Sequence, residues 1–165
     1  SKANGGGELP IEREIRFLVT DGQPPPAEHV AMEQAYLLRG RITARVRNTR
    51  GKGAKAGVKL PFRDGRLEWE WRLPEALARA VLALPLPRVV KTRSREGRLE
   101  VDILGWPAGI VLVELELAPG EGPDLRDAAA RARFMEAHRP AWVRAWRDVT
   151  DDPGYTNARL ARRRP

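Results

Sequence analysis

The segment from Leu67 to Leu73 reads LEWEWRL and alternates apolar and charged residues without a break. Successive side chains of a β-strand point to opposite faces of a sheet, so the alternation predicts a strand with one apolar and one charged face. The charged positions Glu68, Glu70 and Arg72 then share a single face. This segment therefore predicts a sheet that lies with one face on a hydrophobic core.

Similar alternating segments occur over most of the chain. Together with 67–73, they predict strands at 11–19, 33–38, 41–47, 58–60, 88–95, 98–104 and 110–117. Helices are predicted at 75–84, 124–137, 140–147 and 155–163. Tight turns such as Glu96-Gly97 cannot carry a parallel crossover, so the sheet is expected to be antiparallel. The order of the elements indicates an α+β protein.

The chain of 165 residues is long enough for one domain, and 42% of its residues are hydrophobic. It contains no Cys, which excludes disulfides and thiol chemistry. No apolar run approaches the ~20 residues that a membrane helix needs, so no membrane partner is expected. The first seven residues, SKANGGG, lack the apolar stretch of a signal peptide, which predicts a cytoplasmic protein. We predict a flexible leader at 1–10, one domain at 11–161 and a basic tail at 162–165.

On the predicted strands, charges of the same sign recur in pairs two residues apart. The acidic pairs are Glu12 with Glu14, Glu68 with Glu70, Glu100 with Asp102 and Glu114 with Glu116. The basic pairs are Arg45 with Arg47 and Lys91 with Arg93. Each strand alone is typical of a half-exposed sheet, but like charges on one face repel and do not serve stability. Taken together, the pairs favour a closed barrel with a charged interior over an open sheet.

These two kinds of charge suit one kind of ligand. Clustered carboxylates supply the oxygen ligands that hard cations such as Mg²⁺ and Mn²⁺ prefer. Clustered Arg and Lys bind phosphate oxygens. The formal net charge of +8 indicates an anionic partner, and the pairing predicts a small metal-bound polyphosphate. No nucleic acid is required.

Nine motifs follow one another along the chain. They are Glu12-Arg13-Glu14-Ile15-Arg16 with Phe17-Leu18-Val19, Gln34-Ala35-Tyr36-Leu37, Arg45-Val46-Arg47, Lys59, Glu68-Trp69-Glu70, Lys91-Thr92-Arg93, Glu100-Val101-Asp102, Val113-Glu114-Leu115-Glu116, and Val149-Thr150-Asp151-Asp152 with Tyr155 and Asn157. In this order they resemble the motifs of the CYTH domain, also called the triphosphate tunnel metalloenzyme family, in its short single-domain bacterial type. The resemblance covers the chain from Glu12 to Ala161.

The resemblance implies a closed eight-stranded antiparallel β-barrel, or tunnel, with helices packed outside. It also implies that Mg²⁺ or Mn²⁺ acts with the protein on a triphosphate. The implied metal ligands are Glu12, Glu14, Asp102, Glu114 and Glu116. The implied phosphate-binding residues are Arg16, Arg45, Arg47, Lys59, Lys91 and Arg93. Glu68 and Glu70 complete the tunnel wall, while Arg16 and Tyr36 are the implied catalytic residues, with Tyr36 orienting the attacking water.

The sequence departs from the family at Arg16, where the family has lysine. Arginine stays protonated, so it can bind phosphate but cannot take part in base chemistry. The first hypothesis is a metal-dependent triphosphatase that acts on inorganic triphosphate. The alternatives are a class IV-type adenylate cyclase that acts on ATP, and a non-catalytic module that binds polyphosphate or nucleotide. The expected partner is a small-molecule triphosphate or nucleotide, and the chain is expected to be a monomer or a homodimer.

Three smaller expectations concern aromatic and basic residues. Trp69 and Trp71 are expected to pack against the helices. Trp142 and Trp146, four residues apart, are expected to form an apolar stripe on a helix. Lys52 and Lys55 lie in the glycine-rich segment 48–57, which could reach substrate at a tunnel mouth, although a solvated turn is the preferred interpretation.

Overall fold

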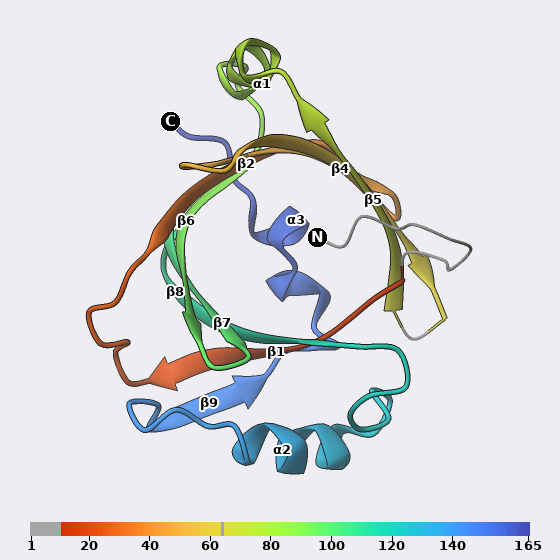
Figure 1. Ribbon diagram of the computed structural model, residues 1–165, viewed down its shortest axis with the longest axis vertical. Coiled ribbons are helices and arrows are strands. Elements are labelled where there is room, and N and C mark those ends of the chain that lie inside the picture. The colour runs from red at the N-terminus through yellow and green to blue at the C-terminus, as the bar shows by residue number, and fades with distance from the viewer. Residues whose placement is uncertain (1–10, 64) are drawn as a thin grey trace.

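Eight antiparallel strands form a closed ring (Figure 1). The computed structural model describes residues 11–63 and 65–165, so the predicted leader at 1–10 lies outside the described residues. The strands of the ring are β1 (Ile11–Asp21), β2 (Val30–Arg39), β3 (Thr43–Thr49), β4 (Gly53–Phe62), β5 (Gly65–Leu73), β6 (Arg88–Glu96), β7 (Leu99–Trp106) and β8 (Ala108–Leu117). The predicted α+β class and the closed eight-stranded antiparallel barrel are confirmed.

The ring runs in the order β5-β4-β3-β2-β6-β7-β8-β1 and closes where β1 pairs with β5. The closing register is short, with Ile11 opposite Leu67 and Glu12 opposite Arg66. At this point a Cβ atom on Gly65 would lie 2.4 Å from the backbone oxygen of Glu12. Glycine is therefore required for β5 to start this close to β1.

The strands alternate as predicted, with charged side chains inside the ring and apolar side chains outside. On β5 the side chain of Glu68 is 14% exposed, whereas Trp69 and Trp71 are 43% and 50% exposed on the other face. The expectation that these two Trp residues pack against helices is wrong. The reason is that α1 (Glu75–Leu82) covers the neighbouring strands instead, through the buried residues Ala78 and Leu82.

Segment 48–57 contains a turn only at 50–52, where Lys52 is exposed as expected, and the rest of it forms the ends of two paired strands. β4 begins at Gly53, and Lys55 lies opposite Arg47 of β3. Lys55 is half-buried, so the preferred interpretation of this lysine as part of a solvated turn is wrong. The backbones of β3 and β4 pair over this segment despite its glycines, which favour a turn.

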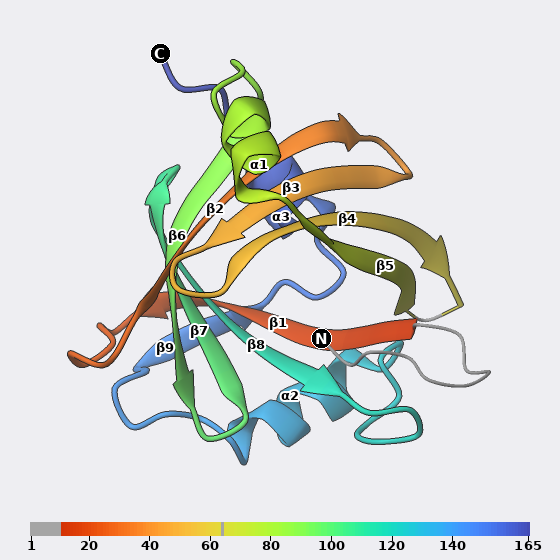
Figure 2. The same cartoon turned by 45° about the horizontal axis from the view of Figure 1, so that its top comes forward.

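Two helices lie outside the ring (Figure 2). Helix α1 begins directly after Pro74, as predicted. Helix α2 (Ala128–Glu136) starts later than expected because the Asp127 carboxylate caps it by accepting from the Ala130 amide. Met135 of α2 is buried against the outer residues of β1, β7 and β8.

The predicted helix at 140–147 is wrong, because this segment contains the short strand β9 (Ala145–Asp148). β9 pairs with the second half of β1, so that Phe17 lies opposite Asp148. The ring of Trp146 packs on Phe17 with centroids 4.9 Å apart, and Trp142 donates to Glu96. The two Trp residues therefore fix β9 and the segment before it against the barrel, and they do not form an apolar stripe on a helix.

The C-terminal segment enters the ring. The predicted helix at 155–163 is shorter and consists of η1 (Pro153–Tyr155) and α3 (Asn157–Leu160), which lie within the ring in Figure 1. Leu160 is buried with Tyr36, Val89 and Leu104, which face inward from β2, β6 and β7. The expectation of outer helices thus holds for α1 and α2, whereas α3 fills one end of the tunnel.

The predicted basic tail is partly tied to the barrel. The backbone of Arg162 pairs with that of Arg88 in an isolated antiparallel bridge. The indole of Trp106 also donates to the Arg162 carbonyl oxygen, at 3.0 Å. Within the described part of the chain, every helix is too short or too polar to span a membrane.

Candidate functional site inside the tunnel

A cavity of about 340 Å³ lies between the tunnel wall and the C-terminal segment. β1 contributes Glu12, Glu14 and Arg16 to its wall, while the opposite wall includes Thr156 and Asn157. Tyr36, Arg45 and Lys59 also line it. The cavity thus brings together six residues that the sequence and the resemblance single out, although they are distant along the chain.

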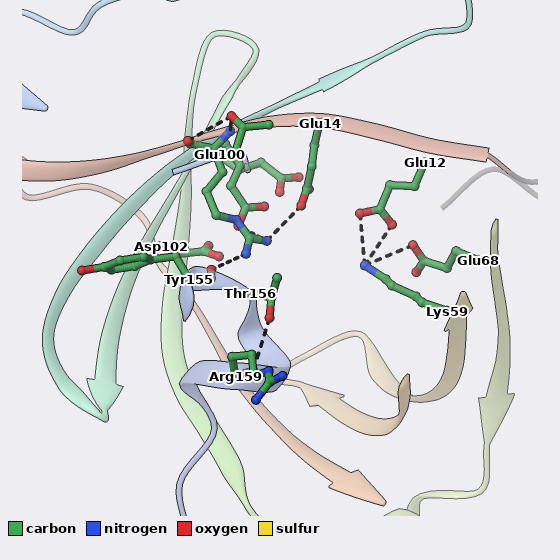
Figure 3. A network of polar contacts seen from close by, with 12 residues as sticks. Glu12, Glu14, Lys59, Glu68, Glu100, Asp102, Tyr155, Thr156 and Arg159 are labelled. Atoms are coloured by element: carbon green, nitrogen blue, oxygen red, sulfur yellow. Dashed lines mark hydrogen bonds and ion pairs between the residues drawn. The ribbon is translucent and has the colours of Figure 1, made fainter. Parts of the chain in front are cut away.

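Lys59 links two acidic strands across this cavity (Figure 3). Its Nζ lies 3.0 Å from both carboxylate oxygens of Glu12 and 3.4 Å from Oε2 of Glu68. Burial opposes ionisation of Glu12, but the charge and hydrogen bond of Lys59 outweigh it and lower the pKa of Glu12. Glu12 is therefore ionised, and Lys59 holds β4 against β1.

Arg16 joins the acidic wall to the C-terminal segment. Its Nη2 donates to Oε1 of Glu14 at 2.9 Å and lies 3.0 Å from Oε1 of Glu114, while its Nη1 donates to the carbonyl oxygen of Tyr155 at 2.5 Å. Burial disfavours the cation, but Glu114 and Glu14 outweigh burial and raise the pKa of Arg16. An ammonium group has no planar fork with which to reproduce this set of contacts.

Carboxylates crowd the junction of β1 and β8. Glu14 lies opposite Glu116, and Arg16 lies opposite Glu114. The pKa of Glu114 is raised by burial and by the charges of Glu14 and Asp102, against the effect of Arg16. Burial and neighbouring carboxylates, Glu12 among them, also raise the pKa of Glu116. Burial and repulsion both contribute to the raised pKa values of Glu114 and Glu116, and a nearby cation would offset both effects.

The donor set at this junction fits a hard divalent cation. It consists of carboxylate oxygens on adjacent strands, and Oε1 of Glu114 is buried without a hydrogen bond, although it lies 3.0 Å from Nη2 of Arg16. Within residues 11–63 and 65–165, however, no three acidic or His side chains converge as a ligand set. In the present arrangement, the Arg16 guanidinium lies between Glu14 and Glu114 and partly neutralises them.

Asp102 has different neighbours from the other acidic residues of the predicted metal set. Its Oδ2 accepts from Lys91 at 2.6 Å, and both of its oxygens accept from Arg93, at 2.7 and 3.0 Å. Burial opposes ionisation, but Lys91 and Arg93 outweigh it and hold the pKa of Asp102 low. The structure thus places Asp102 among cations, and its role as a metal ligand stays a prediction.

The basic residues form a cluster whose members repel one another. Burial lowers the pKa of Lys91 to about 8, and Arg93 and Arg47 add to this effect, although Asp102 opposes it. Burial, together with Arg45 and Arg93, lowers the pKa of Arg47 to about 9. Burial is the main cause of both lowered pKa values, and the neighbouring cations add to it.

Tyr36 is oriented by a residue to which the sequence motifs assigned no role of its own. Its hydroxyl accepts from Nε2 of Gln34 at 3.0 Å, and Oε1 of Gln34 accepts from Arg45 and Arg47 at 2.9 and 3.0 Å. Burial raises the pKa of Tyr36, so its hydroxyl is protonated. Alternation could have identified Gln34, because it lies two residues before Tyr36 on the same strand face.

Arg66 is a second residue that the sequence motifs missed. It lines the cavity and lies opposite Glu12 in the closing register. It precedes Glu68 by two residues, so the alternation of β5 already placed it on the charged face. The N-terminal boundary of the predicted strand at Leu67 excluded it.

The fold and this site define a class of protein: a closed antiparallel β-tunnel with acidic and basic groups facing its interior. A solved structure of the inorganic triphosphatase NE1496 is similar to this chain. The two chains are 25% identical with a TM-score of 0.55, over 94% of this chain and 97% of the other. Another solved structure, of the hypothetical protein NE1496, is also 25% identical, with a TM-score of 0.57 over 91% of this chain and 97% of that one. No family model and no curated protein matches the sequence.

Proposed function

We propose that this chain is a CYTH-type triphosphate tunnel enzyme that hydrolyses inorganic triphosphate with the help of a divalent cation. The observation that carries the proposal is the meeting of buried cations and crowded carboxylates inside one closed ring. The similarity to a protein described as an inorganic triphosphatase, over nearly the whole length of both chains, supports the same activity.

In this proposal the basic cluster binds the phosphoryl groups. Arg45, Arg47, Lys59, Lys91 and Arg93 neutralise the phosphate oxygens, and the Arg residues do so through paired N–H groups. Glu12, Glu14, Glu114 and Glu116 would hold Mg²⁺ or Mn²⁺, which supplies further neutralisation of the phosphates. The Tyr36 hydroxyl, fixed by Gln34, donates a hydrogen bond that positions a water.

The reaction places few other demands on the protein. Water adds to a terminal phosphorus, a bridging P–O bond breaks, and phosphate and pyrophosphate leave. Phosphoryl transfer depends mainly on positioning and on neutralisation of charge, both of which fixed side chains provide. The closed ring of strands keeps these side chains in place.

The test is phosphate release from tripolyphosphate, ATP and thiamine triphosphate, each with Mg²⁺ and with Mn²⁺. We expect tripolyphosphate to be the preferred substrate, and we expect Glu14→Gln to abolish turnover. Appearance of cyclic AMP from ATP would favour the cyclase alternative. Absence of turnover with every substrate would contradict the enzymatic proposal.

One observation favours a second candidate, a module that binds triphosphate without hydrolysing it. Arg16 occupies the position of the family lysine and is engaged with Glu14, Glu114 and the carbonyl oxygen of Tyr155. A permanently protonated group held in this way cannot accept a proton. Calorimetry that detects tight triphosphate binding in a protein without turnover would support this second candidate.

A further inference from the structure

Three cations lie side by side across three strands of the tunnel. Arg47 of β3 is directly opposite Lys55 of β4, and Lys55 is directly opposite Arg72 of β5. We call these three residues the cationic row. Directly opposed residues have Cβ atoms about 4.5–5.5 Å apart, and like charges at this distance destabilise a sheet. Stability therefore does not account for the row.

The cationic row faces the interior of the tunnel. Arg47 and Arg72 follow Arg45 and Glu70 by two residues, and Lys55 precedes Gly57 by two. A Cβ atom at Gly57 would lie 3.4 Å from Nε of Arg45 and 3.7 Å from Cγ of Glu70, so this position points inward. Lys55 and Arg72, which belong to none of the nine sequence motifs, thus share the face of the proposed phosphate site.

The two arginines of the row lack the carboxylates that accompany other tunnel cations. Lys59, Lys91 and Arg93 each contact at least one carboxylate. Among the described residues, Arg47 donates to the neutral Gln34, and Arg72 has no hydrogen bond or ion pair. Both guanidinium groups can therefore bind an anion without first breaking an ion pair.

The row leads toward the end of the tunnel opposite α3. Helix α3 packs on Tyr36, which pairs with Arg45. Arg47 pairs with Gln34 and is thus one step further from α3. Exposure increases along the row, because Arg47 and Lys55 are half-buried and Arg72 is exposed. The row therefore connects the proposed phosphate site with solvent.

We propose that the cationic row binds the phosphoryl units of a linear polyphosphate that extend beyond the third unit, at the end of the tunnel opposite α3. This inference rests on the proposed function and names its substrate class. A linear polyphosphate carries negative charge on every unit, which matches consecutive cations. A nucleotide would instead place an uncharged ribose and base against them.

The test compares tripolyphosphate with tetrapolyphosphate and with a longer linear polyphosphate. The variant Lys55→Ala/Arg72→Ala removes two charges from the row and leaves Arg47 in place. The control Arg50→Ala/Lys52→Ala removes two charges from exposed residues in the adjoining turn. Binding is measured by calorimetry without divalent cation, and kcat and KM are measured with it.

We expect the unmodified protein to bind the longer chains more tightly than tripolyphosphate. In the row variant, affinity for the longer chains should fall about tenfold, while affinity for tripolyphosphate should change by less than about twofold. The control should match the unmodified protein with every ligand. Equal affinity of the unmodified protein for all chain lengths would overturn the inference, as would an equal loss for tripolyphosphate or ATP.

Two further readouts separate polyphosphate binding by the cationic row from catalysis and from fold stability. If no substrate is hydrolysed but the row variant still loses its preference for longer chains, the proposed activity fails and the binding inference stands. Removal of like charges should leave the melting temperature unchanged or raise it. A lower melting temperature, both in this variant and in Lys55→Gln/Arg72→Gln, would mean that the two residues stabilise the fold, and would contradict the inference.

Discussion

At the scale of residues, Arg16 makes structural contacts that its position in the sequence does not reveal. It joins two carboxylates on neighbouring strands to the C-terminal segment, through contacts of 2.5 to 3.0 Å. The sequence placed Arg16 in the tunnel by alternation alone. It could not predict the bond to Tyr155, because that contact depends on where the C-terminal segment enters the ring.

The variant Arg16→Lys should separate a role of this residue in catalysis from its role in holding the C-terminal segment. Lysine can lose a proton, so we expect kcat for tripolyphosphate to rise by about tenfold or more if base chemistry limits the rate. Loss of the bond to Tyr155 should reduce the free energy of unfolding by about 1.5–3 kcal/mol. Steady-state kinetics and urea unfolding measure the two effects. Arg13→Lys, on the outer face of the same strand, is the control and should leave kcat unchanged.

Lys91 should make phosphate binding sensitive to pH. Burial lowers its pKa to about 8, so the folded protein loses this positive charge as the pH rises through that value. Affinity for tripolyphosphate should therefore fall above about pH 8. The unfolded chain keeps the proton up to the ordinary lysine pKa of 10.5, so Lys91 should add stability as the pH rises between these values. Calorimetric titration with tripolyphosphate across this pH range provides the measurement. In the variant Lys91→Met, affinity for tripolyphosphate should be lower and should not change with the protonation of residue 91.

At the scale of elements, alternation identified the strands of the barrel other than β4, because each of them has an apolar and a charged face. Only 58–60 of β4 (Gly53–Phe62) was predicted, since the glycines of 48–57 indicated a turn. Alternation failed for β9, whose four residues form a strand only because β1 offers an unpaired edge there. Composition suggested helices throughout the C-terminal region, whereas its described residues form only α2, the single turn η1 and the short α3. The pairing of individual charges could not be predicted either, since it depends on the stagger of the strands.

Leu160→Ala tests whether α3 stabilises the tunnel. Leu160 is 6% exposed, and its truncation should leave a cavity beside Tyr36 that costs about 2–5 kcal/mol of unfolding free energy. Leu84→Ala is the matched control, because Leu84 is 50% exposed and its loss should cost less than about 0.5 kcal/mol. Urea unfolding of both variants gives the comparison. Equal costs would mean that α3 is not packed in the ring.

At the scale of the whole molecule, the net charge is +8, but both positively and negatively charged side chains are concentrated inside the barrel. The closed ring forces Glu14, Glu114 and Glu116 together on adjacent strands, and the basic cluster lies across from them. Arg16 and Asp102 balance part of these groups, but burial and the neighbouring like charges still raise the pKa values of Glu114 and Glu116 and lower that of Lys91. Ligands that complete this balance should stabilise the molecule as a whole.

Divalent cations should therefore raise the melting temperature, and their removal should stop turnover. Mg²⁺ binding that contributes about 1 kcal/mol would raise the melting temperature of a chain of this size by about 2–4 °C. Thermal unfolding with Mg²⁺ and with a chelator measures this difference, and phosphate release under the same conditions measures turnover. In Glu114→Gln the stabilisation by Mg²⁺ should be smaller. A melting temperature that is the same in all conditions would argue against a cation at this junction.

The closing register between β1 and β5 has a consequence for how the architecture is maintained. The ring depends on the single hydrogen atom that Gly65 carries in place of a side chain, because any larger group would meet the Glu12 carbonyl. A substitution there would force the start of β5 away from β1 without altering one charged residue. A small uncharged residue thus sets how closely the first and fifth strands of the ring around the ionic groups can approach each other.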